Sequence, residues 1–155
     1  MHNPRKLVER QRSTKKVFSG ELLHVYKDEV GLPDGNVSYR EWIDHPGACA
    51  ILPVLSDGRV VFLSQFRYPA QQIFYEVPAG KIDPGEDPLE TVERELKEEA
   101  GVTAENVEYT GLFYPAIGYA NEVIHLFVAW NLELKANNVD SDEFVETCTL
   151  PLMRS

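Results

Sequence analysis

The feature of this chain that most restricts its fold is the segment at residues 80–102, GKIDPGEDPLETVERELKEEAGV. It predicts one α-helix over residues 88–100, because Asp87 is a preferred N-cap residue, a proline follows it, and Glu90 completes a capping box. Gly101 suits the left-handed conformation that ends many helices. Carboxylates crowd this helix, and they repel one another unless a cation lies among them. The segment therefore predicts both a helix and a cation site.

A helical wheel with 100° per residue divides this helix into three faces. Three apolar residues fall within an arc of about 60° and are expected to face the core: Leu89, Val92 and Leu96. Three charged residues lie roughly opposite and are expected in solvent: Glu90, Glu93 and Lys97. Three acids flank the apolar stripe: Glu95, Glu98 and Glu99. The last set stacks on one side of the helix.

These three acids allow two interpretations. A run of acids on a helix is usually a solvated face. However, Glu95 and Glu99 are like charges four residues apart, which destabilises a helix, and acids in the last turn oppose the helix dipole. Both costs disappear if the acids hold a cation. Carboxylate oxygens are the ligands that Mg²⁺ prefers, and such sites commonly serve phosphate chemistry.

Length and composition exclude several other classes of protein. A chain of 155 residues is expected to form one compact domain, and its net charge of −10 argues against binding a nucleic-acid backbone. No apolar run approaches the roughly 20 residues that span a bilayer, and residues 1–16 are basic without the apolar core of a secretory signal. We therefore expect a cytoplasmic protein with no membrane or nucleic-acid partner. Cys49 and Cys148 lack metal-ligand spacing and are expected to be reduced.

The rest of the chain is predicted to be mostly strand. A strand at residues 17–31, a Pro-Asp-Gly turn within residues 32–36 and a second strand at 37–44 predict an N-terminal antiparallel β-hairpin. Further strands are expected at residues 48–55, 60–66, 73–77, 107–113, 123–132 and 144–149. Many strands around one well-capped helix predict an α+β fold or an α/β/α sandwich.

The helical segment also resembles a known motif, the Nudix box, G-x5-E-x7-R-E-U-x-E-E-x-G-U with U apolar. Nine positions match it without a gap: Gly80, Glu86, Arg94, Glu95, Leu96, Glu98, Glu99, Gly101 and Val102. The resemblance implies a Nudix-type α/β/α sandwich with a mixed sheet, here with the N-terminal hairpin as an extension. The implied organisation is a basic arm at residues 1–16, a hairpin region and possible dimer element at 17–45, and a Nudix domain at 46–155.

The resemblance implies that the chain hydrolyses a nucleoside diphosphate linked to another group, using Mg²⁺ or Mn²⁺. The implied metal ligands are the backbone carbonyl of one residue and four carboxylates: Ala79, Glu86, Glu95, Glu98 and Glu99. Arg94 is expected to pair with a glutamate of the box and to fix its rotamer. The metal would neutralise the diphosphate and lower the pKa of an attacking water. Loss of hydrolysis in a fold that keeps the box is the alternative.

Outside the box, residues 20–146 are similar to the ADP-ribose pyrophosphatase branch of the family. The similar stretches are LPDGN, HPGACAILPV, QFRYP, YEVPAGKID and YPAIGYANEVIHLF. This similarity implies that Arg67 contacts the diphosphate or the terminal ribose, although a surface arginine at a strand end is the simpler alternative. Glu76 either reaches the metal or substrate or hydrogen-bonds at the strand edge.

Further substrate contacts are implied by the same branch. Gly118 and Glu122, with Pro115, would shape the loop over the distal sugar, and Glu122 is either a ligand or a structural acid. Tyr39 and Trp42 on the second hairpin strand would form an adenine-stacking wall, often across a dimer, or simply pack at an interface.

In the branch that this chain resembles, the general base usually comes from a late acidic loop, which corresponds here to residues 140–143. Asp142 and Glu143 are the candidates, because related sequences often carry Glu where this chain has Ser141. Glu98 of the box is the alternative, and any of the loop acids could instead cap the loop. The chain also stops where relatives usually add a C-terminal helix, so this helix is either dispensable or removed.

Together these observations predict hydrolysis of ADP-ribose to AMP and ribose 5-phosphate by a homodimer. The nearest alternative substrate is another nucleoside diphosphate sugar, such as a GDP- or UDP-hexose. Dinucleotides such as NADH fit less well. A nucleotide or ADP-ribose sensor that does not hydrolyse is an alternative of another class, although a sensor has no need of the full set of acids.

Overall fold

The chain divides into two units that interleave along the sequence. The computed structural model describes residues 4–134 and 145–151. Unit 1 consists of residues 1–45 and 114–122, and unit 2 of residues 46–113 and 123–155. The chain therefore leaves unit 2 after residue 113, contributes a short segment to unit 1, and returns.

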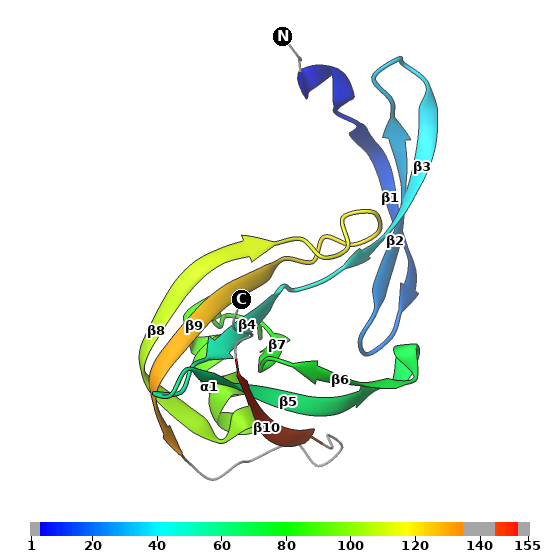
Figure 1. The fold of residues 1–155 in the computed structure, drawn as a ribbon. Coiled ribbons are helices and arrows are strands. Elements are labelled where there is room, and N and C mark those ends of the chain that lie inside the picture. Colours follow the sequence, from blue (N-terminus) through cyan, green and yellow to red (C-terminus); the bar gives the residue numbers. More distant parts are fainter. Residues whose placement is uncertain (1–3, 135–144, 152–155) are drawn as a thin grey trace. The chain divides into compact units, whose positions relative to one another are not determined.

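Unit 1 is built on a three-stranded antiparallel sheet (Figure 1). A short 3-10 helix at Pro4–Leu7 precedes strands β1 (Arg10–Ser19), β2 (His24–Gly31) and β3 (Val37–Asp44), which lie in the order β1-β2-β3. The predicted turn and strand β3 are confirmed: Gly35 has φ of 91° and donates its N–H to the carbonyl of Leu32. The expected N-terminal antiparallel hairpin is therefore present, with one strand more than predicted.

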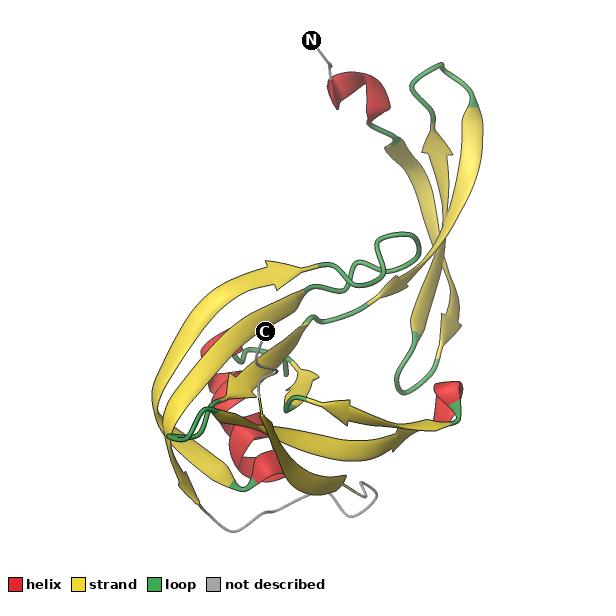
Figure 2. Ribbon diagram, in the orientation of Figure 1, coloured by secondary structure: helices red, strands yellow, loops and turns green. Residues whose placement is uncertain are grey.

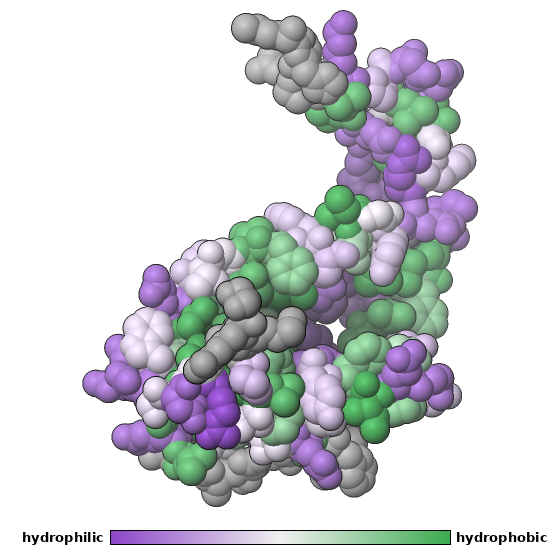
Figure 3. Space-filling model, viewed as in Figure 1, coloured by the Kyte–Doolittle hydropathy of each residue, from purple (hydrophilic) through white to green (hydrophobic). Residues whose placement is uncertain are grey.

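The extra strand corrects the prediction for the N-terminus. Instead of a basic arm at residues 1–16 and one strand at 17–31, the structure has β1, a turn at residues 20–23, and β2. All ten residues of β1 are exposed, and Figure 3 shows both hydrophilic and hydrophobic surface on this sheet. Basic side chains suit such an edge strand, because charges there deter pairing with other chains. Arg12, for example, lies 3.7 Å from Glu29 on β2.

Unit 2 contains two sheets. Strands β7 (Ala79–Lys81), β4 (Ala48–Pro53), β9 (Ile124–Leu134) and β8 (Val102–Phe113) form a mixed sheet in that order, in which β4 and β9 are parallel. Strands β10 (Val145–Pro151), β5 (Arg59–Arg67) and β6 (Gln72–Glu76) form an antiparallel sheet, and a 3-10 turn at Tyr68–Ala70 joins β5 to β6. Figure 2 shows helix α1 (Pro88–Ala100) beside these strands.

The core of unit 2 lies between α1 and the two sheets. It contains ten buried residues from α1, β4, β5, β8 and β9: Cys49, Ile51, Val61, Leu63, Val92, Leu96, Ala100, Val102, Phe127 and Ala129. Because the helix supplies three of them, its position relative to the strands is fixed by apolar packing. The α+β class, the mixed sheet and the N-terminal antiparallel extension are confirmed. Within residues 4–134 and 145–151, α1 is the one α-helix.

The ends of α1 form as the sequence predicts. The Asp87 side chain accepts the N–H groups of Leu89 and Glu90, and the Glu90 side chain accepts the N–H of Asp87 at 3.1 Å, which is a capping box. Gly101 has φ of 63° and satisfies the last carbonyls of the helix. Strand β8 begins directly afterwards, five residues earlier than predicted, because polar residues are tolerated on an edge strand.

Candidate active site

The faces of α1 agree with the helical wheel except at Leu89. Val92 and Leu96 are buried as predicted, and the predicted solvent residues Glu90, Glu93 and Lys97 are exposed. Leu89, however, is 44% exposed and was wrongly assigned to the core. It lies in the first turn and lines a hollow of about 510 Å³ with Tyr109, His125 and Phe127.

Glu99 and Glu95 face the backbone of β7. Glu99 is only 7% exposed, and its Oε2 accepts the N–H of Ala79 at 2.9 Å. Gly80 approaches Glu95 so closely that an added Cβ would lie 1.9 Å from Oε1 and 2.8 Å from Cγ. A Cβ at position 80 would therefore force the Glu95 side chain to move. The helix and β7 together hold two carboxylates against one short stretch of backbone.

Arg94 supplies the positive charge among the acids of the helix. Its Nε and Nη2 each lie 3.0 Å from an oxygen of Glu86, and its Nη1 lies 2.7 Å from Glu95 and 3.2 Å from Glu98. Nη2 also approaches the carbonyl of Lys81 at 3.4 Å. One guanidinium therefore bridges three carboxylates, and Glu86 receives it in the bidentate geometry that favours strong pairing.

The pKa values follow this pairing. Hydrogen bonds from Arg94, and then from Thr91, lower the pKa of Glu86 to about 2. The hydrogen bond to Glu86 is also the largest influence that raises the pKa of Arg94. Both groups are thus charged across the physiological range. Beneath them, burial and then the nearby Glu86 raise the pKa of Cys49 to about 11, so its thiol is neutral.

The residues around β7 fit a divalent metal in their chemistry. Glu95 and Glu99 offer carboxylate oxygens beside the backbone of Ala79, and hard cations such as Mg²⁺ prefer oxygen ligands. Among the described residues, no three Asp, Glu, His or Cys side chains converge into a closed set of ligands. Glu95 and Glu98 are turned toward Arg94 instead, so Arg94 shares them with any cation that binds.

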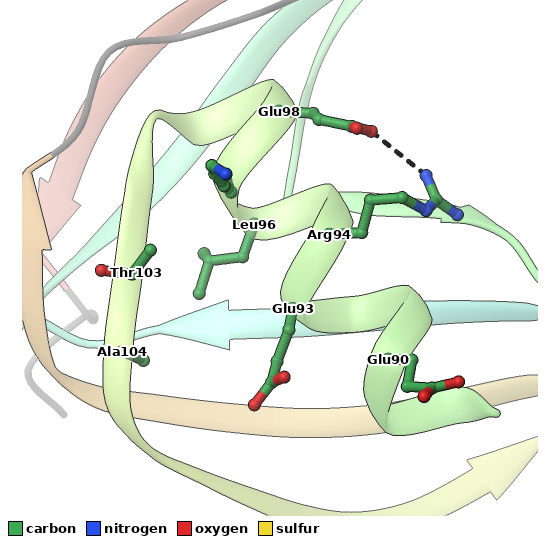
Figure 4. A pocket seen from close by; sticks show the side chains of 8 residues that line it. Glu90, Glu93, Arg94, Leu96, Glu98, Thr103 and Ala104 are labelled. Carbon is green, nitrogen blue, oxygen red and sulfur yellow. Dashed lines mark hydrogen bonds and ion pairs between the residues drawn. The ribbon is translucent and has the colours of Figure 1, made fainter. Parts of the chain in front are cut away.

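A hollow of about 570 Å³ lies beside the cluster, between the outer side of α1 and the start of β8 (Figure 4). Figure 4 shows Glu98 and Arg94 turned toward each other on one side, while Glu93 points away from them. Thr103 and Ala104 of β8 form the opposite wall. Among Glu95, Glu98 and Glu99, Glu98 is the most accessible, since 45% of its side chain is exposed.

The predicted substrate residues Arg67 and Glu76 contact each other. Nε and Nη2 of Arg67 lie 2.8 and 2.7 Å from the two oxygens of Glu76, across the β5–β6 ladder. This bidentate pair joins a strand-end arginine to a strand-edge acid. Large side chains nearby in β5, β6 and the turn between them are widely exposed: Phe66, Tyr68, Ile73 and Tyr75.

The remaining predicted substrate residues in the described part belong to unit 1. Nε2 of His45 lies 3.8 Å from Oε1 of Glu122. Gly118 has no atom within 4 Å of an added Cβ, so the backbone at this position does not require glycine. The segment at residues 114–122 is tied to β3 through backbone bonds of Ile43 with Tyr119 and Asn121.

The aromatic wall expected from Tyr39 and Trp42 is corrected by the register of β3. The two residues are three apart on one strand and therefore point to opposite faces of the sheet. Trp42 stacks on Tyr26 with ring centroids 5.1 Å apart and donates its Nε1–H to Asp28 at 3.0 Å. Tyr39 lies on the other face, beside Lys27. One continuous wall cannot include both rings.

Asp142 and Glu143, the predicted bases, lie outside the described residues together with Asp140. Thr91, in contrast, received no role from the sequence but is fully buried, with its Oγ1 2.7 Å from Glu86. The signal was its position five residues after Glu86 in a helix that begins at Pro88, which turns the two side chains toward each other.

Comparison with known proteins places these features in a family. A family model described as the NUDIX domain matches residues 43–154. The chain is 39% identical over 148 residues to ADP-ribose pyrophosphatase of Bacillus subtilis (strain 168), covering 94% of this chain and 80% of the relative. It is 40% identical over 146 residues to methanol dehydrogenase activator of Bacillus methanolicus, covering 93% and 79%.

A solved structure agrees with the fold. The crystal structure of an ADP compounds hydrolase superposes with a TM-score of 0.81 at 22% identity, covering 93% of this chain and 78% of that one. No helix in the described residues is long and apolar enough to cross a membrane.

Proposed function

This chain belongs to the Nudix hydrolase family, and we propose that it hydrolyses the diphosphate of ADP-ribose to AMP and ribose 5-phosphate with Mg²⁺ or Mn²⁺. The family resemblance of residues 80–102 is thereby confirmed. The observation that carries the proposal is the pair Glu95 and Glu99 held against the backbone of Ala79 and Gly80. The likeness to the Bacillus subtilis ADP-ribose pyrophosphatase supports the choice of substrate.

In this proposal Glu95, Glu99 and the carbonyl of Ala79 hold the divalent metal, with Glu98 and Glu86 close by. The bound metal supplies positive charge for the diphosphate and lowers the pKa of a water molecule. The chain's own residues orient this arrangement: β7 fixes Glu99 through its backbone N–H, and Arg94 fixes Glu86. Without the metal, the carboxylates would repel the anionic substrate.

Further substrate contacts are proposed residue by residue from the family resemblance. Arg67 would bind the diphosphate or terminal ribose, and its pairing with Glu76 supports this by holding the guanidinium in one orientation. Trp42 would stack on the adenine, and Glu122 with Gly118 would contact the distal sugar. Asp142, Glu143 or Glu98 would accept a proton from the attacking water.

Location and assembly form part of the same proposal. Cys49 and Cys148, both within the described residues, are free thiols, which suits the reducing cytoplasm. A homodimer through the hairpin region at 17–45 is supported by exposed apolar residues there, such as Phe18 at 55% and Leu22 at 61%.

The test is a panel of nucleoside diphosphate sugars assayed with Mg²⁺ and compared by kcat/KM. We expect ADP-ribose to be preferred over GDP- and UDP-hexoses. The variant Glu99→Gln should lower kcat/KM at least 100-fold. Altering the surroundings of a metal ligand already costs up to about 100-fold, and Glu99 is a proposed ligand itself. Glu93→Gln on the exposed face of the same helix is the matched control and should stay within twofold. Binding without turnover of any member would favour a sensor, and a preferred hexose would reassign the substrate.

The Bacillus methanolicus relative supports a second candidate function, activation of a methanol dehydrogenase. An assay of methanol oxidation by such a dehydrogenase, with and without this chain, tests it. An unchanged rate of methanol oxidation, with this chain at the same molar concentration as the dehydrogenase, would exclude this function. The hydrolase proposal would not be affected.

A further inference from the structure

Thr91 lies inside the network that holds the acids of α1. Its side chain is fully buried, and its Oγ1 is 2.7 Å from Oε2 of Glu86 and 3.1 Å from the carbonyl of Asp87. A hydroxyl group has one proton to donate, and a carboxylate is a stronger acceptor than a neutral carbonyl. Thr91 therefore donates to Glu86.

Glu86 is held from three directions, since the N–H of Asp83 also donates to its Oε2 at 3.3 Å. Its Oε2 accepts from Thr91 and from Nη2 of Arg94 at 3.0 Å, while its Oε1 accepts from Nε of Arg94 at 3.0 Å. Only 16% of the Glu86 side chain is exposed. The threonine thus fixes one end of the bidentate ion pair to the helix itself.

The position of Glu86 then determines where the Nη1 group of Arg94 lies. The guanidinium is a planar, rigid fork, so fixing its Nε and Nη2 on one carboxylate determines where its Nη1 points. Nη1 contacts Glu95 at 2.7 Å and Glu98 at 3.2 Å. Glu95 is a proposed ligand of the metal, and Glu98 lies close to the proposed metal position. A guanidinium released from Glu86 would be free to pair more fully with them and would compete with a cation.

We propose that Thr91 is a positioning residue that sets the divalent-cation affinity of the site by holding Glu86 against Arg94. This inference rests on the proposed function, since it assumes that Glu95 and Glu98 serve a cation. Thr91 itself touches neither cation nor substrate in this scheme. Its effect passes through one hydrogen bond and one ion pair.

The first experiment measures Mn²⁺ binding to the metal-free protein by electron paramagnetic resonance. Thr91→Val keeps the branched shape but removes the hydroxyl, and we expect it to raise the Kd for Mn²⁺ about tenfold. Thr91→Ser keeps the hydroxyl and should bind within twofold of wild type. Thr110→Val is the matched control, because the Thr110 hydroxyl also donates a hydrogen bond, to the carbonyl of Leu126, far from any acid of α1 along the chain. Thermal unfolding without metal establishes that each variant is folded.

The second experiment combines Thr91→Val with Glu86→Gln. If Thr91 acts through Glu86, the double variant should bind Mn²⁺ no more weakly than Glu86→Gln alone, within twofold. Fully additive losses would overturn the inference, as would wild-type affinity in Thr91→Val. Equal weakening in Thr91→Ser and Thr91→Val would also overturn it, since packing of the methyl group would then explain the effect.

The outcomes separate this inference from the proposed function. If the wild-type protein neither binds Mn²⁺ nor hydrolyses any nucleoside diphosphate sugar, both the proposed function and the role of Thr91 are refuted. If wild type binds and hydrolyses but Thr91→Val behaves like wild type, only the role of Thr91 falls. Should Thr91→Val fail to fold, Thr91→Ala replaces it in both experiments with the same expected result.

Discussion

The close approach of Gly80 to Glu95 gives the sharpest prediction. In Gly80→Ala, the new Cβ would lie 1.9 Å from Oε1, 2.1 Å from Cδ and 2.8 Å from Cγ of Glu95. Because nonbonded carbon and oxygen atoms rarely approach within about 3 Å, the carboxylate must move by about 1 Å or more. The inner end of the side chain is also too close, so turning the carboxylate alone does not relieve the overlap.

The magnitude follows from what this displacement breaks. Glu95 would leave its 2.7 Å contact with Arg94 and its place beside Glu99 on β7. A displacement of about 1 Å at a catalytic group can cost about 100-fold in rate, whereas overpacking costs about 1–3 kcal/mol of stability. We therefore expect Gly80→Ala to remain folded at 25 °C and to lose about 100-fold in kcat/KM for ADP-ribose.

The assay is AMP release from ADP-ribose with saturating Mg²⁺, with Mn²⁺ binding as an independent measurement. Gly31→Ala is the matched control, because an added Cβ there meets atoms at an ordinary 3.8 Å and φ is not positive. It should retain wild-type activity. The reasoning is refuted if Gly80→Ala keeps both kcat/KM and Mn²⁺ affinity within threefold of wild type.

Three further predictions concern the metal, the buried thiol and the hairpin sheet. Chelation with EDTA should abolish hydrolysis and added Mg²⁺ should restore it, and full activity in chelator would exclude metal catalysis. Cys49, whose pKa is raised to about 11 in the folded state from an ordinary 9.0, stabilises the fold below pH 9, and this contribution is lost as pH rises through 11. In Cys49→Ala the unfolding free energy should therefore fall less steeply between pH 9 and 11, and an unchanged slope measured by urea unfolding would contradict this. Trp42→Phe removes the Nε1–H donor of the buried Asp28 and should lower Tm by about 4 °C, whereas Tyr39→Phe on the opposite face should leave Tm unchanged. Equal Tm values for both variants would show that this hydrogen bond is not stabilising.

Local signals predicted α1 well. Its capping box and its C-terminal glycine act within a few residues, so both ends follow from neighbours in the chain. Periodicity located Val92 and Leu96 in the core for the same reason. Leu89 was misplaced because its burial depends on what the sheet offers opposite the first turn, and periodicity carries no such information.

The pairing of residues distant in sequence was harder to predict. The motif indicated that Arg94 would meet an acid, but it did not indicate that Glu86, Glu95 and Glu98 would share one guanidinium. Arg67 and Glu76 were each assigned to substrate, because nothing local shows that their side chains reach each other between the paired strands β5 and β6. The basic N-terminus was likewise predicted to be an arm, although residues 10–19 form strand β1 and pair with β2.

The route of the chain between the two units limits how this protein can be divided. Residues 114–122 lie between β8 and β9 in sequence, yet they pair with Ile43, which precedes unit 2. A fragment that begins at Pro46 would keep this segment and lose its partner. A fragment that ends at His45 would keep Ile43 but lose residues 114–122, with which Ile43 pairs. The boundary near residue 45 is therefore unsuited to modular exchange, and a chimaera that transplants the hairpin sheet must carry residues 114–122 with it.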